Sequence, residues 1–468
     1  MRGIVAYGAY LPYWRLERKA IAEALGVPAG SGTRAVASYD EDTTSLGVEA
    51  GRAALRGLSI APQALYFATS APAYLDKTNA TAIHAALDLP ASAFAVDVAG
   101  SVRAAVGAMR AARDARAPAL AVLSDVRTGL PGGGDERDGG DGAAAFLFAD
   151  DAPEARVLAE PLGAASATAE FLDRWRLPGE AASHVWEERF GEHAYVPLGE
   201  AALTEALKHA GVTAPALARL IVAGPHGRAV KRVAAAAGVK KEAIADDLVA
   251  SIGNAGAAQA GLMFADALDR AQPDDLVAVV SLADGADASV WRVSAATKRP
   301  AGVAARLAGG GRVGYPTFLA WRGFLQREPP RRPDPQAPEA PPSLRAEAWK
   351  FAFTGSRCQA CGARHLPPQR VCVKCHAVDR MAPERLADVA ATIATFTVDR
   401  LAYSPSPPMV VAVLDFEGGG RFQSEMTDVD PKAVKIGDRV GMTFRRLITA
   451  GSVHNYFWKA RPLGGAAR

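Results

Sequence analysis

The chain has 468 residues, a formal net charge of +3, and 49% hydrophobic and 22% charged residues. This length exceeds one ordinary hydrophobic core, so the composition predicts a globular protein of two or three domains. The near balance of charge argues against a nucleic-acid or membrane-surface partner. The sequence also has no signal-peptide pattern and no run of about 18 apolar residues that would predict a membrane span.

The first part of the chain predicts two similar α/β halves. In the first half, FAVDVAGSVRAAVGAMRAARD predicts a strand, a turn and a helix, followed by the strands PALAVLSDVRTG and GDGAAAFLFAD. In the second half, ARLIVAGPHGRAVKRVAAAAGV repeats the strand, turn and helix. SIGNAGAAQAGLMFADALD then predicts a glycine-rich turn and a helix before the strands DLVAVVSLADG and ASVWRVS. Apolar strands that alternate with amphipathic helices are typical of parallel sheets covered on both faces.

A proline-rich segment follows the α/β region. Seven of the fourteen residues from Pro329 to Pro342 are proline. Because proline fixes φ and lacks a backbone N–H, this segment predicts a stiff, extended linker without helix or central strand.

All the cysteines fall into two CxxC pairs: Cys358, Cys361, Cys372 and Cys375. Two pairs this close predict a tetrahedral structural zinc, because four thiolates fill the metal shell and leave no open position for catalysis. His365 and His376 are surplus to the four ligands, and we expect them to face solvent. Reduced thiols at metal spacing favour a cytoplasmic protein.

The segment after the second cysteine pair predicts a small closed β-barrel. Its strand candidates are ATIATFTVDRL, MVVAVLDFEGG, GRFQSEMT and DRVGMTFRRLI, separated by the turn-forming stretches SPSPP, EGGGR and VDPKAVKIGD. It has neither a dense basic stripe nor interleaved stacking aromatics, so we expect no nucleic-acid partner.

Several of these motifs resemble known families. GIVAYGAYLP, LSDVRTGLPGGGDERDGGDGAAAFLF and SIGNAGAAQAGLMFADALD resemble the thiolase superfamily, specifically its 3-hydroxy-3-methylglutaryl-CoA synthase and type III ketoacyl synthase branch, over residues 1–296. Residues 343–462, with FTGSRCQACGARHLPP and VKIGDRV, resemble the zinc-ribbon and OB-fold family that accompanies acyl-CoA thiolases and synthases. The resemblance implies a duplicated five-layered αβαβα fold, a CoA thioester as substrate and a homodimer of the thiolase-like unit. It also implies a possible partner thiolase and a barrel that helps to bind the pantetheine arm.

With this resemblance the chain divides into five parts. Residues 1–150 and 151–298 are the two thiolase-like halves, and residues 299–342 are a connector that ends in the proline-rich linker. A helix and the zinc ribbon are expected at 343–384, and the OB-fold barrel at 385–468.

The nucleophile of the related enzymes is missing. Relatives take up an acyl group on a cysteine at a helix N-terminus, and the resemblance puts Gly100 of AFAVDVAGSVRAAV at that place, with Ser101 one residue on. Ser101 could be acylated only with a strong base beside it; the alternative is a serine that caps the helix. The synthase branch also uses a glutamate in a stretch that resembles FATSAPAYLDKTNA, where this chain has Ser70 or Ala71 and no carboxylate before Asp76.

Part of the apparatus that holds the thioester oxygen is retained. The relatives use a histidine and an asparagine, and in VAGPHGRAVKRV the best register puts Ala223 at the histidine position and His226 three residues later. His226 is therefore either an active-site residue brought in by a shifted loop or a surface histidine. Asn254 in SIGNAG matches the asparagine, whose amide can donate to an oxyanion; the alternative is an ordinary turn asparagine.

These residues leave three functions open. The first is an enzyme that makes or breaks a C–C bond beside a CoA thioester through an enolate, with His226 or Tyr74 as base. The second is a non-catalytic acyl-CoA-binding partner of a thiolase, and the third, least favoured, is an acyltransferase that uses Ser101. The first predicts His226 or Tyr74 within hydrogen-bond reach of Asn254, whereas the second does not. The run PGGGDERDGGDG lacks the Lys-Ser/Thr of a P-loop, and we expect it at the active-site mouth or the dimer interface.

Overall fold

The computed structural model describes residues 2–28, 30–331 and 336–463. Nine strands of the α/β region form one mixed sheet in the order β11-β12-β13-β8-β1-β7-β6-β4-β5. The two halves of this sheet join where Ile4 pairs with Ala159. The strands are β1 (Arg2–Tyr10), β4 (Ala64–Thr69), β5 (Phe94–Ala99), β6 (Ala119–Val126), β7 (Asp141–Asp150), β8 (Ala159–Ala167), β11 (Arg219–Ala223), β12 (Leu276–Leu282) and β13 (Ala286–Val293).

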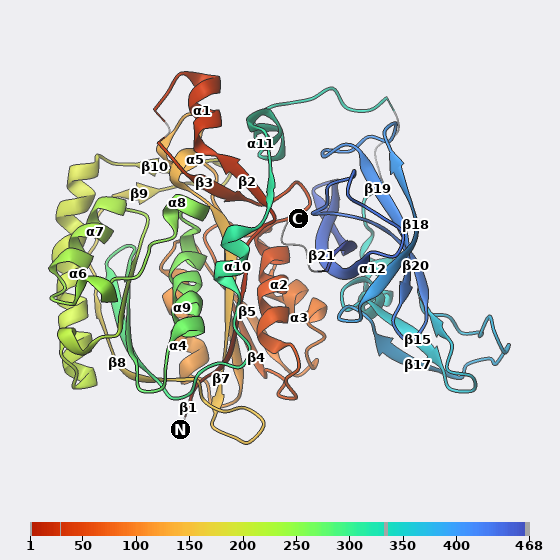
Figure 1. Cartoon of the computed structure of the whole chain (residues 1–468), viewed down its shortest axis with the longest axis horizontal. Helices are drawn as coiled ribbons and strands as arrows, with labels where there is room; N and C mark the ends of the chain where they lie inside the picture. The colour runs from red at the N-terminus through yellow and green to blue at the C-terminus, as the bar shows by residue number, and fades with distance from the viewer. Residues whose placement is uncertain (1, 29, 332–335, 464–468) are drawn as a thin grey trace.

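Helices cover both faces of each half-sheet. Figure 1 shows α6 and α7 on one outer side, α4 and α9 in the middle, and α2 and α3 on the opposite outer side. The layers alternate helix, sheet, helix, sheet, helix, so the five-layered αβαβα prediction is confirmed. The helices are α2 (Thr43–Leu55), α3 (Ala80–Ala86), α4 (Ala104–Asp114), α6 (Glu188–Ala210), α7 (Gly227–Ala236) and α9 (Gln259–Arg270).

The core follows these layers. The middle layer, between the two half-sheets, is filled by alanines of α4 and by larger apolar side chains of α9 such as Leu262, Met263 and Phe264. The helix α9 places Gly261 against the sheet, where a Cβ would come within 2.8 Å of Leu123. A second cluster lies under α6 and α7, and a third continues from α2 into the C-terminal barrel.

The N-terminal hairpin and the connector form one small subdomain. Strand β14 of the connector pairs with β2, which pairs with β3, so the connector packs onto the start of the chain. Its elements are β2 (Trp14–Glu17), α1 (Arg18–Leu25), β3 (Thr33–Val36), α10 (Val303–Ala308), β14 (Gly311–Arg312) and α11 (Tyr315–Trp321).

Shorter elements complete the α/β region. They are α5 (Gly134–Asp138), β9 (Arg174–Trp175), β10 (His184–Val185), α8 (Val249–Ile252) and the 3₁₀ turns η1 (Ala214–Ala216), η2 (Lys241–Ala243) and η3 (Gly256–Ala258). No helix among the described residues is both long enough and apolar enough to cross a lipid bilayer.

The end of the proline-rich segment corrects one prediction. Helix α12 (Ala340–Arg345) begins inside that segment, although we predicted no helix before residue 343. Proline is tolerated in the first helical turn, where its missing N–H would have no intrahelical partner, and the two prolines occupy that turn. A further short helix, α13 (Glu347–Lys350), leads into the ribbon, and residues 332–335 of the segment lie outside the described residues.

The C-terminal part consists of the predicted ribbon and barrel. The ribbon strands are β15 (Thr354–Cys358), β16 (Arg364–His365) and β17 (Met381–Arg385). The barrel sheet has the order β20-β19-β18-β21-β22, and a bridge between Met426 and Ala460 joins its ends. Its strands are β18 (Ala391–Asp399), β19 (Met409–Phe416), β20 (Arg421–Glu425), β21 (Arg439–Ala450) and β22 (Val453–Pro462), of which β22 was not among the four strand candidates.

The barrel packs directly on α2 (Figure 1). Arg52 of α2 donates to the backbone carbonyls of Met442 and Ala387, and its guanidinium lies over the ring of Trp458. The barrel is therefore fixed to the α/β region by contacts well beyond the linker.

Candidate functional site

The carboxyl ends of the parallel strands β5, β4 and β6 meet at one edge of the first half-sheet. The strand registers place Ser70, which follows β4, between Gly100 after β5 and Asp125 on β6. Ligands of α/β sheets bind outside the carboxyl ends of the strands, so this edge is the candidate site.

Gly100 opens the turn between β5 and α4. Its φ is +127°, a conformation that favours glycine, and no described atom lies within 4 Å of the place where a Cβ would stand. Ser101 accepts a hydrogen bond from the backbone N of Arg103 at 3.3 Å. Within the described part of the chain, no histidine or carboxylate hydrogen-bonds the Ser101 hydroxyl. This geometry is that of a serine that caps a turn at the start of a helix.

Asn254 is held in a tight turn before η3. Its Nδ2 donates to the carbonyl of Gly224 at 2.7 Å, and its Oδ1 accepts from the backbone N of Gly256 at 2.9 Å. The turn needs glycine at position 253, where φ is +75° and a Cβ would stand 2.0 Å from the carbonyl oxygen of Gly139. The amide oxygen of Asn254 therefore faces the turn, and its N–H group lies along the wall of a cleft.

His226 is the residue before α7 and lies against the same cleft. Its Nδ1 accepts from the backbone N of Ala229 at 3.1 Å, and its Nε2 donates to the carbonyl of Glu188 at 2.8 Å. His226 is 7% exposed, so it is a buried helix-capping residue and not the surface histidine of the alternative interpretation. Both ring nitrogens are engaged by backbone groups.

Tyr74 lies elsewhere. Its hydroxyl accepts a hydrogen bond from the backbone N of His454 at 2.7 Å, and the two rings are 4.7 Å apart, so Tyr74 packs against the β21–β22 hairpin of the barrel. Across residues 2–28, 30–331 and 336–463, neither Tyr74 nor His226 forms a hydrogen bond with Asn254.

The cleft beside Asn254 and His226 has a volume of about 790 Å³. Part of the glycine-rich run lines it, namely Gly133, Gly134, Asp135, Arg137 and Asp138. The cations that line it are Arg18, Arg137, Arg174, Arg228 and Lys231. The anions are Asp135, Asp138, Glu188 and Asp247. Four of the five cations pair with acids of the same lining, as Arg18 and Arg137 do with Asp138, so it is the size of the cleft that suits an extended ligand.

A polar cluster at the strand ends was missed by the sequence interpretation. Asp125 is fully buried and accepts four hydrogen bonds, from the hydroxyl of Thr69, the backbone and hydroxyl of Ser70, and the backbone of Ala257. Arg127, two residues further, donates to the Ser70 hydroxyl at 3.1 Å. The signal was present in LSDVRTG, where an acid stands near the end of a buried strand and an arginine directly follows that strand.

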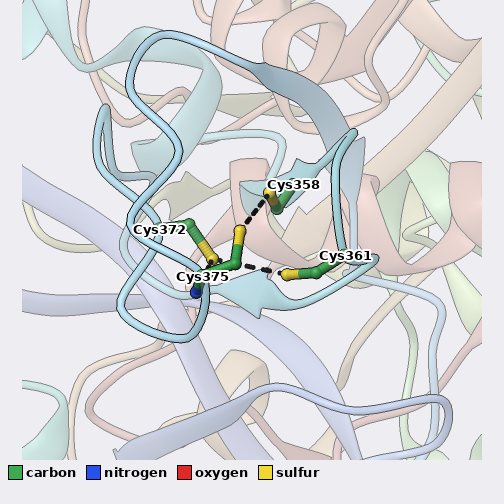
Figure 2. Close-up of side chains that lie close together, drawn as sticks. All are labelled: Cys358, Cys361, Cys372 and Cys375. Atoms are coloured by element: carbon green, nitrogen blue, oxygen red, sulfur yellow. Dashed lines mark hydrogen bonds between the residues drawn. The ribbon is translucent and has the colours of Figure 1, made fainter.

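The four cysteines come together at the tips of the ribbon (Figure 2). Their sulfur atoms lie within 4.8 Å of one another, with Cys358 and Cys375 at 3.6 Å and Cys361 and Cys372 at 3.5 Å. Four thiolates around a tetrahedral zinc at about 2.3 Å would lie about 3.8 Å apart, so the arrangement fits that metal.

The two neighbouring histidines differ. His376 is exposed, as expected, whereas His365 is 6% exposed and its Nε2 has no hydrogen-bond partner within the described chain. The prediction that His365 faces solvent is wrong, because β16 pairs with β15 and turns this side chain into the ribbon.

Comparison with known proteins agrees with this architecture. The chain is 31% identical over 304 residues to the hydroxymethylglutaryl-CoA synthase of Aeropyrum pernix, which covers 62% of this chain and 83% of the relative. The chain belongs to the hydroxymethylglutaryl-CoA synthase family. The synthase of Methanopyrus kandleri is 28% identical over 305 residues, covering 62% of this chain and 86% of that protein.

Several solved structures have the same fold. MvaS in complex with 3-hydroxy-3-methylglutaryl coenzyme A superposes with a TM-score of 0.58 at 21% identity, covering 72% of this chain and 94% of that chain. The 3-oxoacyl-(acyl carrier protein) synthase III FabH of Pseudomonas aeruginosa PAO1 superposes with a TM-score of 0.55 at 21% identity, covering 63% of this chain and 98% of that one.

The remainder of this family member matches other family models. Residues 351–379 match the model of the ChsH2 rubredoxin-like zinc ribbon domain, and residues 384–445 match that of the ChsH2 C-terminal OB-fold domain. The resemblance of the chain to both groups of proteins is therefore confirmed.

Proposed function

We propose that this protein binds a CoA thioester in the cleft beside Asn254 and makes or breaks a C–C bond next to the thioester carbonyl through an enolate, without a covalent acyl-enzyme. Hydroxymethylglutaryl-CoA synthase relatives, and solved structures of such synthases with CoA or 3-hydroxy-3-methylglutaryl coenzyme A, support the ligand class. Lys231 lines the cleft and forms no ion pair within the described part of the chain, so its charge is available for the phosphates of the ligand.

The observation that carries the proposal is the pairing of Gly100 with Asn254. The position expected for the nucleophile has no side chain, whereas the expected amide is retained and its orientation is fixed by Gly224 and Gly256. A fixed N–H donor that faces a thioester oxygen stabilises the enolate charge, and that stabilisation needs no nucleophile.

Proton transfer is assigned to His226. It lines the cleft with Asn254, whereas Tyr74 is engaged by the barrel. His226 would act as a base by releasing the backbone N–H of Ala229 from its Nδ1.

One observation favours the second candidate, a non-catalytic acyl-CoA-binding partner of a thiolase. Both ring nitrogens of His226 and the hydroxyl of Tyr74 are engaged by backbone groups, so no base faces Asn254 directly within the described chain. Acyl transfer through Ser101 has the least support, because its hydroxyl caps the turn before α4.

The fold also supports a metal and an assembly. We propose a structural zinc on the four ribbon cysteines, which have the right spacing and chemistry. We propose a homodimer through β5, the edge strand of the large sheet, because an open edge with Phe94 57% exposed favours strand pairing with a second copy. Four metal-bound thiols suit a reducing, cytoplasmic location.

The test is incubation of the purified protein with a panel of CoA esters, followed by mass spectrometry of small-molecule products and intact protein. We expect C–C cleavage or condensation products and no acyl adduct. Absence of products with retained binding would favour the non-catalytic partner. An acyl ester on Ser101, lost together with activity in Ser101→Ala, would restore the acyltransferase.

A further inference from the structure

A second cavity lies in the middle layer of the α/β region, between the helices α4 and α9 and the strands β8, β12 and β13. Its volume is about 70 Å³, and it shares no lining residue with the cleft beside Asn254. Its walls are mostly apolar. The larger apolar side chains of the lining are Val106, Met109, Leu123, Phe264, Val279 and Trp291. The cavity is therefore a candidate binding site of its own.

Small side chains explain why this space is open. Ala164 of β8 pairs with Ser289 of β13, which pairs in turn with Val279 of β12. These three side chains share the sheet face toward the helices, because cross-strand partners point to the same face. On the helix side, α4 contributes Ala105 and α9 contributes Gly261. Protein interiors are normally packed without gaps larger than a water molecule, so the gap between these small side chains has room for an apolar group from outside the chain.

One end of the cavity is polar and carries an excess positive charge. Arg110 of α4 lines it, and its side chain is 40% exposed, so this guanidinium stands between the cavity and solvent. Asp287 pairs with Arg110 at 3.2 Å and with Arg103 at 2.8 Å, so two guanidinium groups share one buried carboxylate. Ser281 also lines the cavity, and its hydroxyl forms no hydrogen bond within residues 2–28, 30–331 and 336–463. A cation and a free hydroxyl are thereby available to an anionic group.

We propose that this cavity binds a short-chain monocarboxylate, with its alkyl tail among the apolar side chains and its carboxylate at Arg110 and Ser281. A mostly apolar pocket with a few polar groups at one end is complementary to a ligand of this kind, and a guanidinium binds a carboxylate through charge-assisted hydrogen bonds.

The volume of the cavity limits the length of the tail. One water-sized group needs roughly 10–15 Å³ of such space, so about 70 Å³ holds about five of them. The ligand is therefore an acid of about four to six carbons. The inference goes beyond the proposed function and does not depend on it, because the cavity and the cleft have separate linings.

The experiment measures dissociation constants by calorimetry for the full chain with pentanoate, acetate and pentylamine. We expect pentanoate to bind at least about thirtyfold more tightly than acetate, because it buries three more methylene groups. Pentylamine has a tail of similar length but a cationic head, and we expect it to bind at least about tenfold more weakly than pentanoate. A saturating concentration of coenzyme A should leave the affinity for pentanoate unchanged.

Two variants test the two ends of the ligand. Ser281→Leu fills the cavity without changing its charge, and Arg110→Gln removes the excess cation while Asp287 keeps its ion pair with Arg103. Each is expected to weaken pentanoate binding at least about tenfold. Because the side chain of Arg110 is partly exposed, Arg110→Gln keeps the test valid if Ser281→Leu does not fold.

Arg292→Gln is the matched control. Arg292 follows Trp291 on β13, but its side chain lies outside the lining and pairs with Glu160 at 3.1 Å. This variant is expected to bind pentanoate like the full chain.

The inference is overturned if pentanoate does not bind at concentrations up to about 10 mM, or if pentylamine binds as tightly. Unchanged affinity for pentanoate in either folded variant would also overturn it. Displacement of pentanoate by coenzyme A would place the acid in the cleft and overturn the inference while leaving the proposed function standing.

Discussion

The molecule contains two groups of buried or half-buried cations that differ in how their charge is balanced. At the contact between α2 and the barrel, Arg445 is 0% exposed and lies 2.6 Å from Asp428, 3.2 Å from Glu41 and 3.7 Å from Asp40. Lys459, next to it, pairs with Asp40 at 3.1 Å. At the strand-end edge, Arg127 and Arg176 reach Ser70 and pair with no acid of the described chain.

The difference teaches how to separate a structural charge cluster from a ligand-binding one. Buried charges that form ion pairs within the protein fix two parts of the chain relative to each other. Buried charges without such a pair beside a cleft can bind a ligand of opposite charge. Substitutions in the first group are therefore expected to lower stability without changing ligand preference. Substitutions in the second group are expected to change ligand preference without lowering stability. The predictions below test that division.

Zinc removal is expected to have the largest effect. A structural zinc contributes on the order of 10 kcal/mol to the folding of a small metal domain, so chelation should unfold the ribbon, residues 351–379 with the adjoining strand β17. The matched cluster lies outside the ribbon and should keep the barrel on α2. Hydrogen exchange with and without chelator is the measurement, and the expected result is lost protection in β15 to β17 with retained protection in α2 and β21. Metal analysis that finds no zinc in fresh protein would contradict the prediction.

Arg445→Met should be the next most damaging change. It leaves Asp40, Glu41 and Asp428 buried without their shared cation, and breaking a buried pair in this way costs about 3–5 kcal/mol. Urea unfolding of the full chain and of Arg445→Met gives the free energy of unfolding, with Arg176→Gln as the control from the unmatched group. A larger loss of unfolding free energy for Arg176→Gln than for Arg445→Met would contradict the division between matched and unmatched charges.

The same contrast explains which features the sequence could predict. The strands FAVDVA and GDGAAAFLFAD are recognisable because most of their residues are apolar, and β5 and β7 cover those stretches. Strand β22 was not predicted because two residues on its face toward the α/β region, Lys459 and Arg461, are charged. Their acidic partners Asp40 and Glu49 lie about 400 residues earlier, and no local pattern reveals such a pair.

The candidate site was predictable to a similar extent. Asn254 could be predicted because the glycines of its turn form a local sequence motif. The metal ligands could be predicted from the spacing of the cysteines. Arg176 lies in a segment without periodicity and reaches Ser70 only because the β9–β10 hairpin folds over the first half-sheet. The capping role of His226 likewise depends on Glu188, an acceptor from another helix.

Glu49 provides a pH test of the matched group. Although burial raises its pKa, Arg52, Arg461 and Arg445 outweigh burial and lower the pKa of Glu49 to about 2, from an ordinary value of 4.5. A depressed folded-state pKa gives stability that is present above about pH 4.5 and is lost as the pH falls towards 2. We expect the advantage of the full chain over Glu49→Gln in free energy of unfolding to shrink by up to about 3 kcal/mol across that window.

The measurement is urea unfolding of both proteins at several pH values between 2 and 6. Only the difference between them counts, because other carboxylates titrate in both. Arg52 pairs with Glu49 at 2.7 Å and Arg461 pairs with it at 3.0 Å, so the lost stability should come with loosening of α2 from the barrel. If the difference in unfolding free energy between the two proteins does not depend on pH, folding does not lower the pKa of Glu49, and its ion pairs with Arg52 and Arg461 do not stabilise the contact.

Asn254→Ala is expected to lower turnover of a CoA ester by about 10²-fold, equivalent to about 2.7 kcal/mol, while changing stability least. The reason is that one preorganised donor to the enolate oxygen is lost, whereas the turn keeps its glycines and backbone bonds. Asn254→Asp sharpens the test, because a carboxylate oxygen can still accept from Gly256 but cannot donate to the substrate. If both variants lose turnover equally while the protein stays folded, the amide acts on the thioester. If Asn254→Ala keeps full turnover in a folded protein, the only role of Asn254 is to hold the turn. The division between paired structural groups and unpaired functional groups would then apply to charged side chains and not to neutral donors.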